Sequence, residues 1–274
     1  MTDKTQDQVM RDELQQMELD ENGNDGVELS MVIDKQRCTG CGGCNIACAK
    51  ENNLQEGTAP AFSSNITKTE GQFPNVKYDY TPTLCNQCKD APCAEGCPTS
   101  ALYKGEGGIT MHDHEQCIGC KYCKINCPYD EIHFHKEDPH PRWDSDEAVI
   151  EDGTATPQEV IEETGRQVTP FYNPNREVGE HEHPTRYKGI VEKCTFCVHR
   201  VKEGELPSCV EACPCDARIF GDLNDPDSKV NEVLGMYDPE VRKAEAGTEP
   251  KVKYVREFNG GSYDRGKGEP ALGD

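Results

Sequence analysis

The apolar residues of this chain fall into short runs, each bounded by polar or turn-forming residues. Leu29–Asp34 is a mostly apolar run whose length and composition predict a buried strand. Within residues 4–21, Met10, Leu14 and Met17 recur at i, i+4 and i+7, which predicts a short amphipathic helix. Such a stripe is typical of a frayed arm or a small packing face rather than of a dedicated docking helix.

The rest of the pattern predicts small elements. Cys97–Leu102 is typical of a short helix that turns into a strand, and Ile109–Met111 of a strand that returns after a glycine turn. Lys251–Phe258 predicts another strand, and Thr156–Thr164 a short helix within an acidic stretch. Residues 51–79 are polar and rich in turn formers, so we expect a linking segment there.

Composition alone would place much of the chain among disordered proteins. Hydrophobic residues make up 34% of the 274 residues and the formal net charge is −22, a combination that rarely buries enough apolar surface to fold. The 17 cysteines change this interpretation, because bound metal supplies folding free energy that a small core lacks. The acidic balance favours solubility, including in a high-salt medium, and disfavours nucleic-acid binding.

Sixteen of the cysteines form four groups. Group one is Cys38, Cys41, Cys44 and Cys48; group two is Cys85, Cys88, Cys93 and Cys97; group three is Cys117, Cys120, Cys123 and Cys127; group four is Cys194, Cys197, Cys209 and Cys213. Groups one and three have the x2, x2, x3 spacing of bacterial ferredoxins, in which three thiolates hold one iron–sulfur cluster and the fourth reaches a neighbouring cluster. Groups two and four widen one gap to x4 and x11.

An internal repeat relates the groups. Asp34 and Asp113 each stand four residues before the first cysteine of groups one and three. Cys213-Pro214-Cys215-Asp216-Ala217 aligns with Cys97-Pro98-Thr99-Ser100-Ala101, which indicates duplicated ferredoxin units. The alignment puts Cys215 opposite a threonine, so we expect an inert, partly buried thiol there.

Two other uses of cysteine fit less well. An odd number of cysteines disfavours a disulfide framework, which suits short secreted chains. Structural zinc prefers two ligand pairs separated by a dozen or more residues, a spacing that only group four approaches. The repeat favours iron–sulfur ligation for group four as well.

The four groups, together with Lys193-Cys194-Thr195-Phe196-Cys197 and Phe220-Gly221-Asp222-Leu223, resemble a known family. It comprises the iron–sulfur, electron-transfer subunits of complex molybdopterin oxidoreductases of the dimethyl sulfoxide reductase family, whose members serve dimethyl sulfoxide, polysulfide, thiosulfate, tetrathionate and arsenate reductases. The resemblance covers about residues 30–60, 80–135 and 188–228. A related nitrate reductase subunit has tryptophan at the position of Cys120 and builds a three-iron cluster; this chain keeps the cysteine.

The resemblance implies four 4Fe–4S clusters, each held by cysteines from two groups. We name the implied ligand sets A to D: set A is Cys38, Cys41, Cys44 and Cys213; set B is Cys48, Cys194, Cys197 and Cys209; set C is Cys85, Cys88, Cys93 and Cys127; set D is Cys97, Cys117, Cys120 and Cys123.

The implied fold class is α+β, with two bacterial-ferredoxin-like two-cluster modules, long loops and an acidic surface insertion. The implied divisions are an acidic N-terminal arm at 1–29, one module at 30–79 with 188–228, a second module at 80–135, the acidic insertion at 136–187 with Trp143, and a C-terminal tail at 229–274. The arm and the insertion depart from the family pattern, as does Ala49, where the other groups have proline.

In this family, electrons run from a membrane quinol-oxidising anchor subunit to a molybdopterin catalytic subunit. The resemblance therefore implies an electron-transfer subunit of an anaerobic respiratory reductase with these two partners, inactive as an enzyme alone. The chain has no nucleophile–base pair, glycine-rich phosphate loop or flavin motif. The alternatives are an electron-transfer subunit of a formate dehydrogenase or hydrogenase, and a metal-stabilised scaffold without redox function.

The apolar pattern also bears on location. No apolar run approaches the length of a membrane span, and no leader or twin-arginine segment opens the chain. We therefore expect attachment to the membrane through partner subunits, on the outer face by export with a signal-bearing partner; the cytoplasmic face is the alternative.

Cationic and imidazole side chains near the cysteines are secondary candidates. The bases that could raise cluster potentials are Lys121, Lys124, Lys193 and Arg200, with ordinary surface charge as the alternative. The histidines at i, i+2 spacing around group three are His112, His114, His133 and His135. Each pair shares a strand face, so one interpretation is metal ligation and the other is exposed or hydrogen-bonded side chains.

Overall fold

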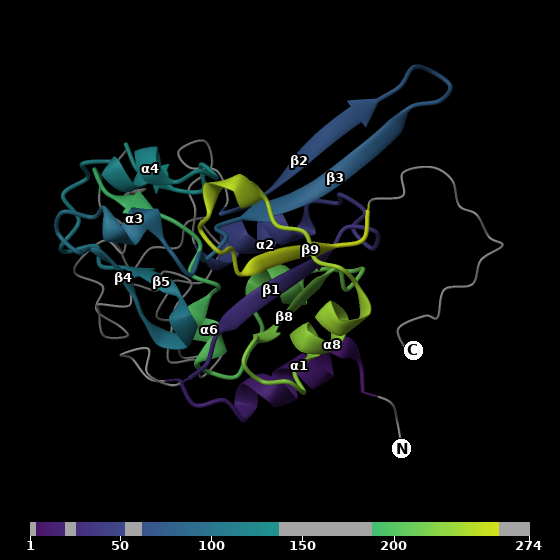
Figure 1. Cartoon of the computed structure of the whole chain (residues 1–274), viewed down its shortest axis with the longest axis horizontal. Helices are drawn as coiled ribbons and strands as arrows, with labels where there is room; N and C mark the ends of the chain where they lie inside the picture. Colours follow the sequence, from purple (N-terminus) through teal and green to yellow (C-terminus); the bar gives the residue numbers. More distant parts are fainter. Residues whose placement is uncertain (1–3, 20–25, 53–61, 137–187, 258–274) are drawn as a thin grey trace, which may run out of the picture.

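A three-stranded sheet forms the centre of the molecule (Figure 1). The computed structural model describes residues 4–19, 26–52, 62–136 and 188–257. Strand β1 (Leu29–Asp34) lies in the middle, antiparallel to β8 (Arg218–Asp222) and parallel to β9 (Val252–Val255). Every residue of β1 is buried, as the apolar run predicts, and β9 confirms the strand predicted near the end of the described chain.

Two helices cover this sheet. Helix α1 (Gln6–Gln15) begins with a capping box at Thr5, and α8 (Lys229–Met236) is capped by the Ser228 hydroxyl. The predicted N-terminal helix is therefore confirmed, and its Met10 side chain is fully buried against the sheet. The helix is a packing face of the core rather than a frayed arm.

A long β-hairpin projects from the body (Figure 1). Strands β2 (Ser63–Glu70) and β3 (Lys77–Leu84) pair antiparallel along their whole length. The expectation of a linking segment at 51–79 was wrong for this part. Strand β2 is mostly polar and exposed, so it lacks the alternating apolar face that marks a strand in sequence. Strand β3 does have aromatic or apolar residues at every second position from Tyr78 to Leu84, and the sequence reasoning missed this pattern.

The segment around groups two and three is built from short elements. They are α3 (Pro92–Glu95), β4 (Leu102–Lys104), the 3₁₀ turn η1 (Glu106–Gly108), β5 (Thr110–His112), α4 (Tyr122–Asn126) and β6 (His133–Phe134). The glycine turn and the two strands of the β4–β5 hairpin agree with prediction to within a residue. The helix predicted after Cys97 was wrong, because Ser100 adopts φ 56° there and breaks any helical run.

The remaining elements carry groups one and four. They are α2 (Gly43–Glu51), β7 (Val191–Glu192), α6 (Val198–Val201), α7 (Ser208–Glu211) and the 3₁₀ turn η3 (Ala244–Ala246). Helices α2 and α7 pack against each other, and β7 pairs with β6. The segment of group four therefore packs both against the helix of group one and against the strand that follows group three.

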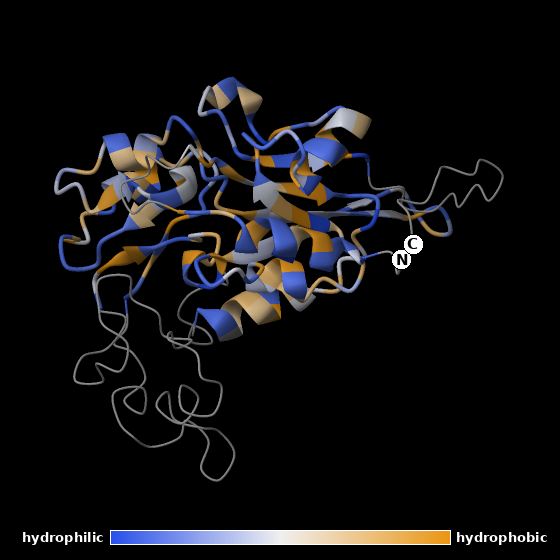
Figure 2. Ribbon diagram, turned by 90° about the horizontal axis from the view of Figure 1, so that it is seen from below, coloured by the Kyte–Doolittle hydropathy of each residue, from blue (hydrophilic) through white to orange (hydrophobic). Residues whose placement is uncertain are grey.

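The protein is thus a mixed helix and sheet fold, shown coloured by residue hydropathy in Figure 2. Its buried hydrophobic residues form two clusters. The larger cluster surrounds β1 and includes Phe196 and Phe220, whose rings meet edge to face. The smaller one lies under α3, β4 and α4 and contains Ile132 and Tyr129. The predicted helix at 156–164, Trp143 and the acidic insertion from residue 137 onward lie outside the described residues.

Candidate cluster-binding sites

The loops before groups one and three share one turn geometry. Asp34 Oδ1 accepts hydrogen bonds from the N–H groups of Gln36 and Arg37. Asp113 Oδ1 accepts the equivalent bonds from residues 115 and 116. This is an Asx turn, in which a short carboxylate replaces backbone partners. The repeat seen in sequence is therefore repeated in hydrogen bonding, and it delivers the first cysteine of each group in the same way.

Set D lines a single hollow of about 300 Å³. Cys97, which follows α3, comes together there with Cys117, Cys120 and Cys123 of the next group. Burial raises the pKa of Cys123 to about 11, with the other three among the groups that act in the same direction. The cysteines implied to share this cluster are thus neighbours.

The set D loop has no room for a side chain at Gly119, in the middle of the loop. Its φ is 66°, and a Cβ atom there would lie 1.8 Å from the carbonyl oxygen of Gly189. The loop therefore depends on glycine both for its conformation and for close approach to a neighbouring segment.

Set A lines a second hollow, of about 350 Å³. Its members Cys38, Cys41 and Cys44 meet Cys213 of group four there, and Asn65 and Pro82 of the β2–β3 hairpin complete the wall. The base of the projecting hairpin is therefore part of this site.

Set B is the most enclosed, because all four of its thiols are buried. Burial raises the pKa of Cys48 to about 12, and the charge of Cys209 adds to it. Burial also raises the pKa of Cys197, with Cys209, Cys48 and Cys194 as its charged neighbours. The four thiols of set B therefore lie close to one another.

Set C is assembled from groups two and three in the same crosswise manner. Burial raises the pKa of Cys93 to about 12, and Cys85, Cys127 and Cys88 are the thiols that raise it further. The pKa of Cys127 is raised by burial and by Cys85, although backbone N–H groups of residues 129–131 act to lower it.

The four sets follow one another in space. Cys209 of set B interacts with Cys44 of set A, and Cys194 of set B interacts with Cys85 of set C. Cysteines of sets C and D share the smaller hydrophobic cluster. The two exposed cysteines of the described residues are Cys41 in set A and Cys120 in set D. Set A is therefore next to set B, set B next to set C and set C next to set D, and sets A and D each have one exposed cysteine.

These donor sets suit a polynuclear group better than a single ion. Among the described residues, no three His, Cys, Asp or Glu side chains converge closely enough to hold one metal ion. The cysteines instead surround hollows, and they are soft thiolate donors of the kind that iron–sulfur clusters use. The raised thiol pKa values mean that cluster binding must displace protons from buried sulfur.

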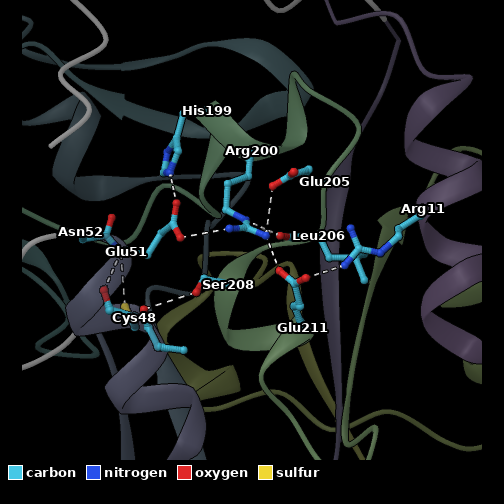
Figure 3. Close-up of polar contacts among 11 residues, drawn as sticks. Arg11, Cys48, Glu51, Asn52, His199, Arg200, Glu205, Leu206, Ser208 and Glu211 are labelled. Carbon is cyan, nitrogen blue, oxygen red and sulfur yellow. Dashed lines mark hydrogen bonds and ion pairs between the residues drawn. The ribbon is translucent and has the colours of Figure 1, made fainter. Parts of the chain in front are cut away.

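A network of ion pairs links the elements around set B (Figure 3). Arg200 Nη1 lies 3.0 Å from the Glu51 carboxylate of α2, and its other terminal nitrogen pairs with Glu205 and with Glu211 of α7. His199 Nε2 also bonds Glu51, at 2.8 Å. Arg11 of α1 pairs with Glu211. The network joins α2, α6 and α7, which between them carry or flank three set B cysteines.

The cations predicted to tune the clusters differ in their surroundings. Lys124 pairs with Asp130 near the surface, and Lys121 lies 3.8 Å from the centroid of the Phe134 ring. Lys193 is buried and donates to the backbone carbonyls of Thr110 and Cys194. Arg200 is buried but is surrounded by carboxylates.

Three further cations near the cysteines were missed by the sequence reasoning; Lys251 and Arg218 are buried, whereas Lys104 is exposed. Lys104 donates to the carbonyl of Cys88, Lys251 donates to the η1 turn, and Arg218 lies between sets A and B. Burial lowers the pKa of Lys251 to about 8, with Lys104 contributing. A lone lysine or arginine in a polar sequence carries no signal of burial.

The four histidines come together around one carboxylate. Glu192 lies 3.3 Å from His114 Nε2 and 2.5 Å from His135 Nε2, and the His112 and His114 ring centroids are 4.8 Å apart. His112, His114 and His135 are buried rather than exposed. The pairing of His114 and His135 with Glu192 fits the expectation of hydrogen-bonded side chains, which fails for His112. His133 stacks on Phe62.

The seventeenth cysteine, Cys215, lies outside the four groups. Cys215 is partly buried, as predicted, and its Sγ lies 3.8 Å from Thr39 Oγ1 beside set A.

None of the described helices has the length and apolar content that crossing a membrane requires.

Comparison with known proteins shows what the chain is similar to. The family model of the 4Fe–4S dicluster domain matches residues 76–142 and 180–223. The iron–sulfur subunit of arsenate respiratory reductase from Shewanella sp. (strain ANA-3) is 48% identical over 85% of this chain and 97% of its own length. A selenate reductase subunit from Mesobacillus selenatarsenatis is 36% identical (84% and 72%), and a tetrathionate reductase subunit from Salmonella typhimurium is 32% identical (82% and 71%).

Proposed function

Because this chain belongs to the family of iron–sulfur, electron-transfer subunits of molybdopterin oxidoreductases, we propose that it carries four 4Fe–4S clusters in one relay. The relay connects a membrane quinol-oxidising anchor subunit with a molybdopterin catalytic subunit of an anaerobic respiratory reductase. Sets A to D are the proposed ligands, with one cluster for each set.

The observation that carries this proposal is the crosswise convergence of distant cysteines. Cys213 lines the hollow of group one, and Cys97 lines the hollow of group three. A structural zinc site places four ligands around a single ion, and among the described residues no three such ligands converge on one point. Sharing of cysteines between neighbouring groups is instead the arrangement of two-cluster ferredoxins.

A 4Fe–4S cluster held by four thiolates accepts and returns one electron without proton chemistry. The chain supplies the spacing and insulation for such a relay. Sets B and C are largely enclosed, and sets A and D each present one exposed cysteine. Electrons would therefore enter and leave at the two ends, near Cys41 and near Cys120, rather than through the middle.

The exposed ends suit docking with redox partners. Ile118, Tyr122 and Ile125 are exposed around set D, and Ile46 is exposed beside group one on α2. Apolar side chains next to an exposed cluster site allow close, dry contact with another subunit. We propose that the two ends contact the two partner subunits, and that the complex attaches to the membrane through the anchor, on the outer face after export with a signal-bearing partner.

The proposal is tested by anaerobic purification of the full chain. We expect about sixteen irons and sixteen acid-labile sulfides for each chain, which is the content of four 4Fe–4S clusters. Electron paramagnetic resonance during a redox titration should resolve clusters that accept electrons at physiological potentials. Zinc in place of iron, or clusters that cannot be reduced, would contradict the proposal.

The identity of the partner subunits is tested by co-purification. Pull-down of the tagged chain from anaerobically grown cells should recover a molybdopterin-containing subunit and a membrane subunit. Recovery of a formate dehydrogenase or hydrogenase large subunit in their place would support the alternative direction of electron flow.

A further inference from the structure

Arg218 is the largest fully buried side chain in the described part of the chain. It opens strand β8, where it pairs in register with Ile33 of β1, and its side chain is 2% exposed. Its guanidinium donates to Ser63 Oγ at 2.8 Å at the base of the β2–β3 hairpin. The side chain is thus fixed from the sheet on one side and from the hairpin on the other.

The same guanidinium reaches two cysteines that belong to different sets. Arg218 Nη2 lies 3.4 Å from Cys44 Sγ of set A, and Nη1 lies 3.5 Å from Cys209 Sγ of set B. The remaining polar contact is Met31 Sδ, at 3.6 Å from Nη1. One planar cation therefore spans the two neighbouring sites.

Within the described residues, Arg218 has no carboxylate partner within ion-pair distance, whereas Arg200 has three. A buried charge without a counter-charge is strongly unfavourable. The groups next to the guanidinium that can carry a negative charge are the thiols of Cys44 and Cys209. The charge is therefore balanced by sulfur.

The internal repeat supplies a comparison within the same molecule. Arg218 follows Cys213 at the position where Leu102 follows Cys97. Each lines the hollow of its own set, Arg218 that of set A and Leu102 that of set D. The two repeats differ at this position by one full positive charge.

We propose that Arg218 is a shared counter-charge that raises the reduction potentials of the clusters held by sets A and B together, and that set D, with Leu102, lacks this effect. The inference rests on the proposed function, because it concerns the same clusters. Reduction adds one negative charge, and a fixed cation that donates hydrogen bonds to the ligand sulfurs favours the reduced form. Arg218 is a positioning and tuning residue rather than a ligand.

The test uses the full chain, purified anaerobically with its clusters, in wild-type form and as Arg218→Leu. Redox titration followed by electron paramagnetic resonance should show two cluster signals moving to lower potential in the variant, while the other two stay in place. We expect at least a tenfold loss in each reduction equilibrium, which is about 59 mV for a one-electron couple. No shift, or a shift of signals from sets C and D alone, overturns the proposal.

Two further variants separate charge from packing. Arg218→Lys keeps the charge and should keep both potentials near the wild-type values, whereas Arg218→Gln keeps a polar side chain without charge and should lower both. If the leucine variant loses iron, this second comparison decides, and equal potentials in the two variants overturn the proposal. Lys229→Met is the matched control, because it removes a cation that pairs with Glu232 on α8, and it should move no signal.

The same experiment separates this inference from the proposed function. A wild-type chain without reducible clusters contradicts the proposed function itself. A wild-type chain with four reducible clusters and an Arg218→Leu variant of unchanged potentials contradicts only the role of Arg218.

Discussion

Cys41 and Cys213 line one hollow, although most of the chain lies between them in sequence. The turn at Asp34 leads into group one, which includes Cys41, and Cys213 at the end of group four lies in the same place. Under this pairing, each group of four cysteines contributes ligands to two cluster sites. Substituting one cysteine at a time therefore tests which cysteines share a cluster.

Replacing Cys127 by serine should damage the cluster held with Cys85, Cys88 and Cys93 rather than the cluster of its own group. The reason is that Cys127 interacts with Cys85, while Cys117, Cys120 and Cys123 lie with Cys97. The measurement is the set of paramagnetic signals in the reduced variant, with iron content as a second readout. Loss of the set D signal alone would refute the crosswise pairing.

Replacing Cys215 by serine should leave iron and sulfide content unchanged. Its thiol borders set A beside Thr39, but set A already has four cysteines. The matched comparison is Cys213→Ser, two residues away, which removes a member of the set and should cost up to four irons. Equal iron loss in both variants would mean that Cys215 is a ligand.

Part of this fold could be predicted from the sequence because local rules decide it. The strand Leu29–Asp34 is a short, mostly apolar run, and the helix stripe of Met10 and Leu14 places those side chains in the core. The repeated positions of Asp34 and Asp113 could be seen in the sequence, although the Asx turns that they form were not predicted.

Other parts could not be predicted because their stability is not local. The β2–β3 hairpin is held by its ladder, and Asn65 and Pro82 near its base line the hollow of set A. Strand β2 itself is mostly polar and has no apolar face that would predict it. Arg218 is buried only because sulfur from two distant groups surrounds it. In sequence, such a residue is indistinguishable from a surface arginine.

Glu51→Gln should weaken the network of ion pairs around set B. Glu51 accepts from His199 and Arg200, and the substitution leaves the buried Arg200 with one carboxylate fewer. We expect a loss of about 3 kcal/mol at most, since removal of one partner from a buried ion pair costs about that much. The measurement is the guanidinium concentration at which cluster absorbance is lost. Glu245→Gln, on an exposed carboxylate of η3, is the control and should behave as wild type.

The same carboxylate gives a pH dependence. Burial acts to raise the pKa of Glu51, but the hydrogen bond from His199 and the charge of Arg200 lower it overall. Its stabilising contribution is therefore complete above the ordinary glutamate pKa and disappears as the pH falls through the lowered folded-state value. The Glu51→Gln variant should lose less stability than wild type across that acidic range, and parallel curves would contradict this assignment.

His112→Leu should reduce the amount of folding stability that the protein loses in mild acid. Burial lowers the pKa of His112 to about 3, with His114 and Lys193 acting in the same direction and Glu192 and Asp113 opposing it. The ring nitrogens of His112 have no hydrogen-bond partner among the described residues. The unfolded chain takes up a proton below the ordinary histidine pKa of about 6.5, whereas the folded chain does so only near 3. Folding stability is therefore lost progressively as the pH falls between these values.

The size of the effect follows from the width of that window. Between about pH 8 and about pH 5, His112 should cost wild type about 2 kcal/mol that the leucine variant does not lose. Denaturation at pH 8 is the internal control, because His112 is neutral there in both states and any difference reflects packing alone. The quantity to compare is the change between the two pH values within each protein. An equal change in wild type and variant would mean that His112 becomes protonated inside the folded structure, and that the cluster of histidines around Glu192 accepts charge rather than excluding it.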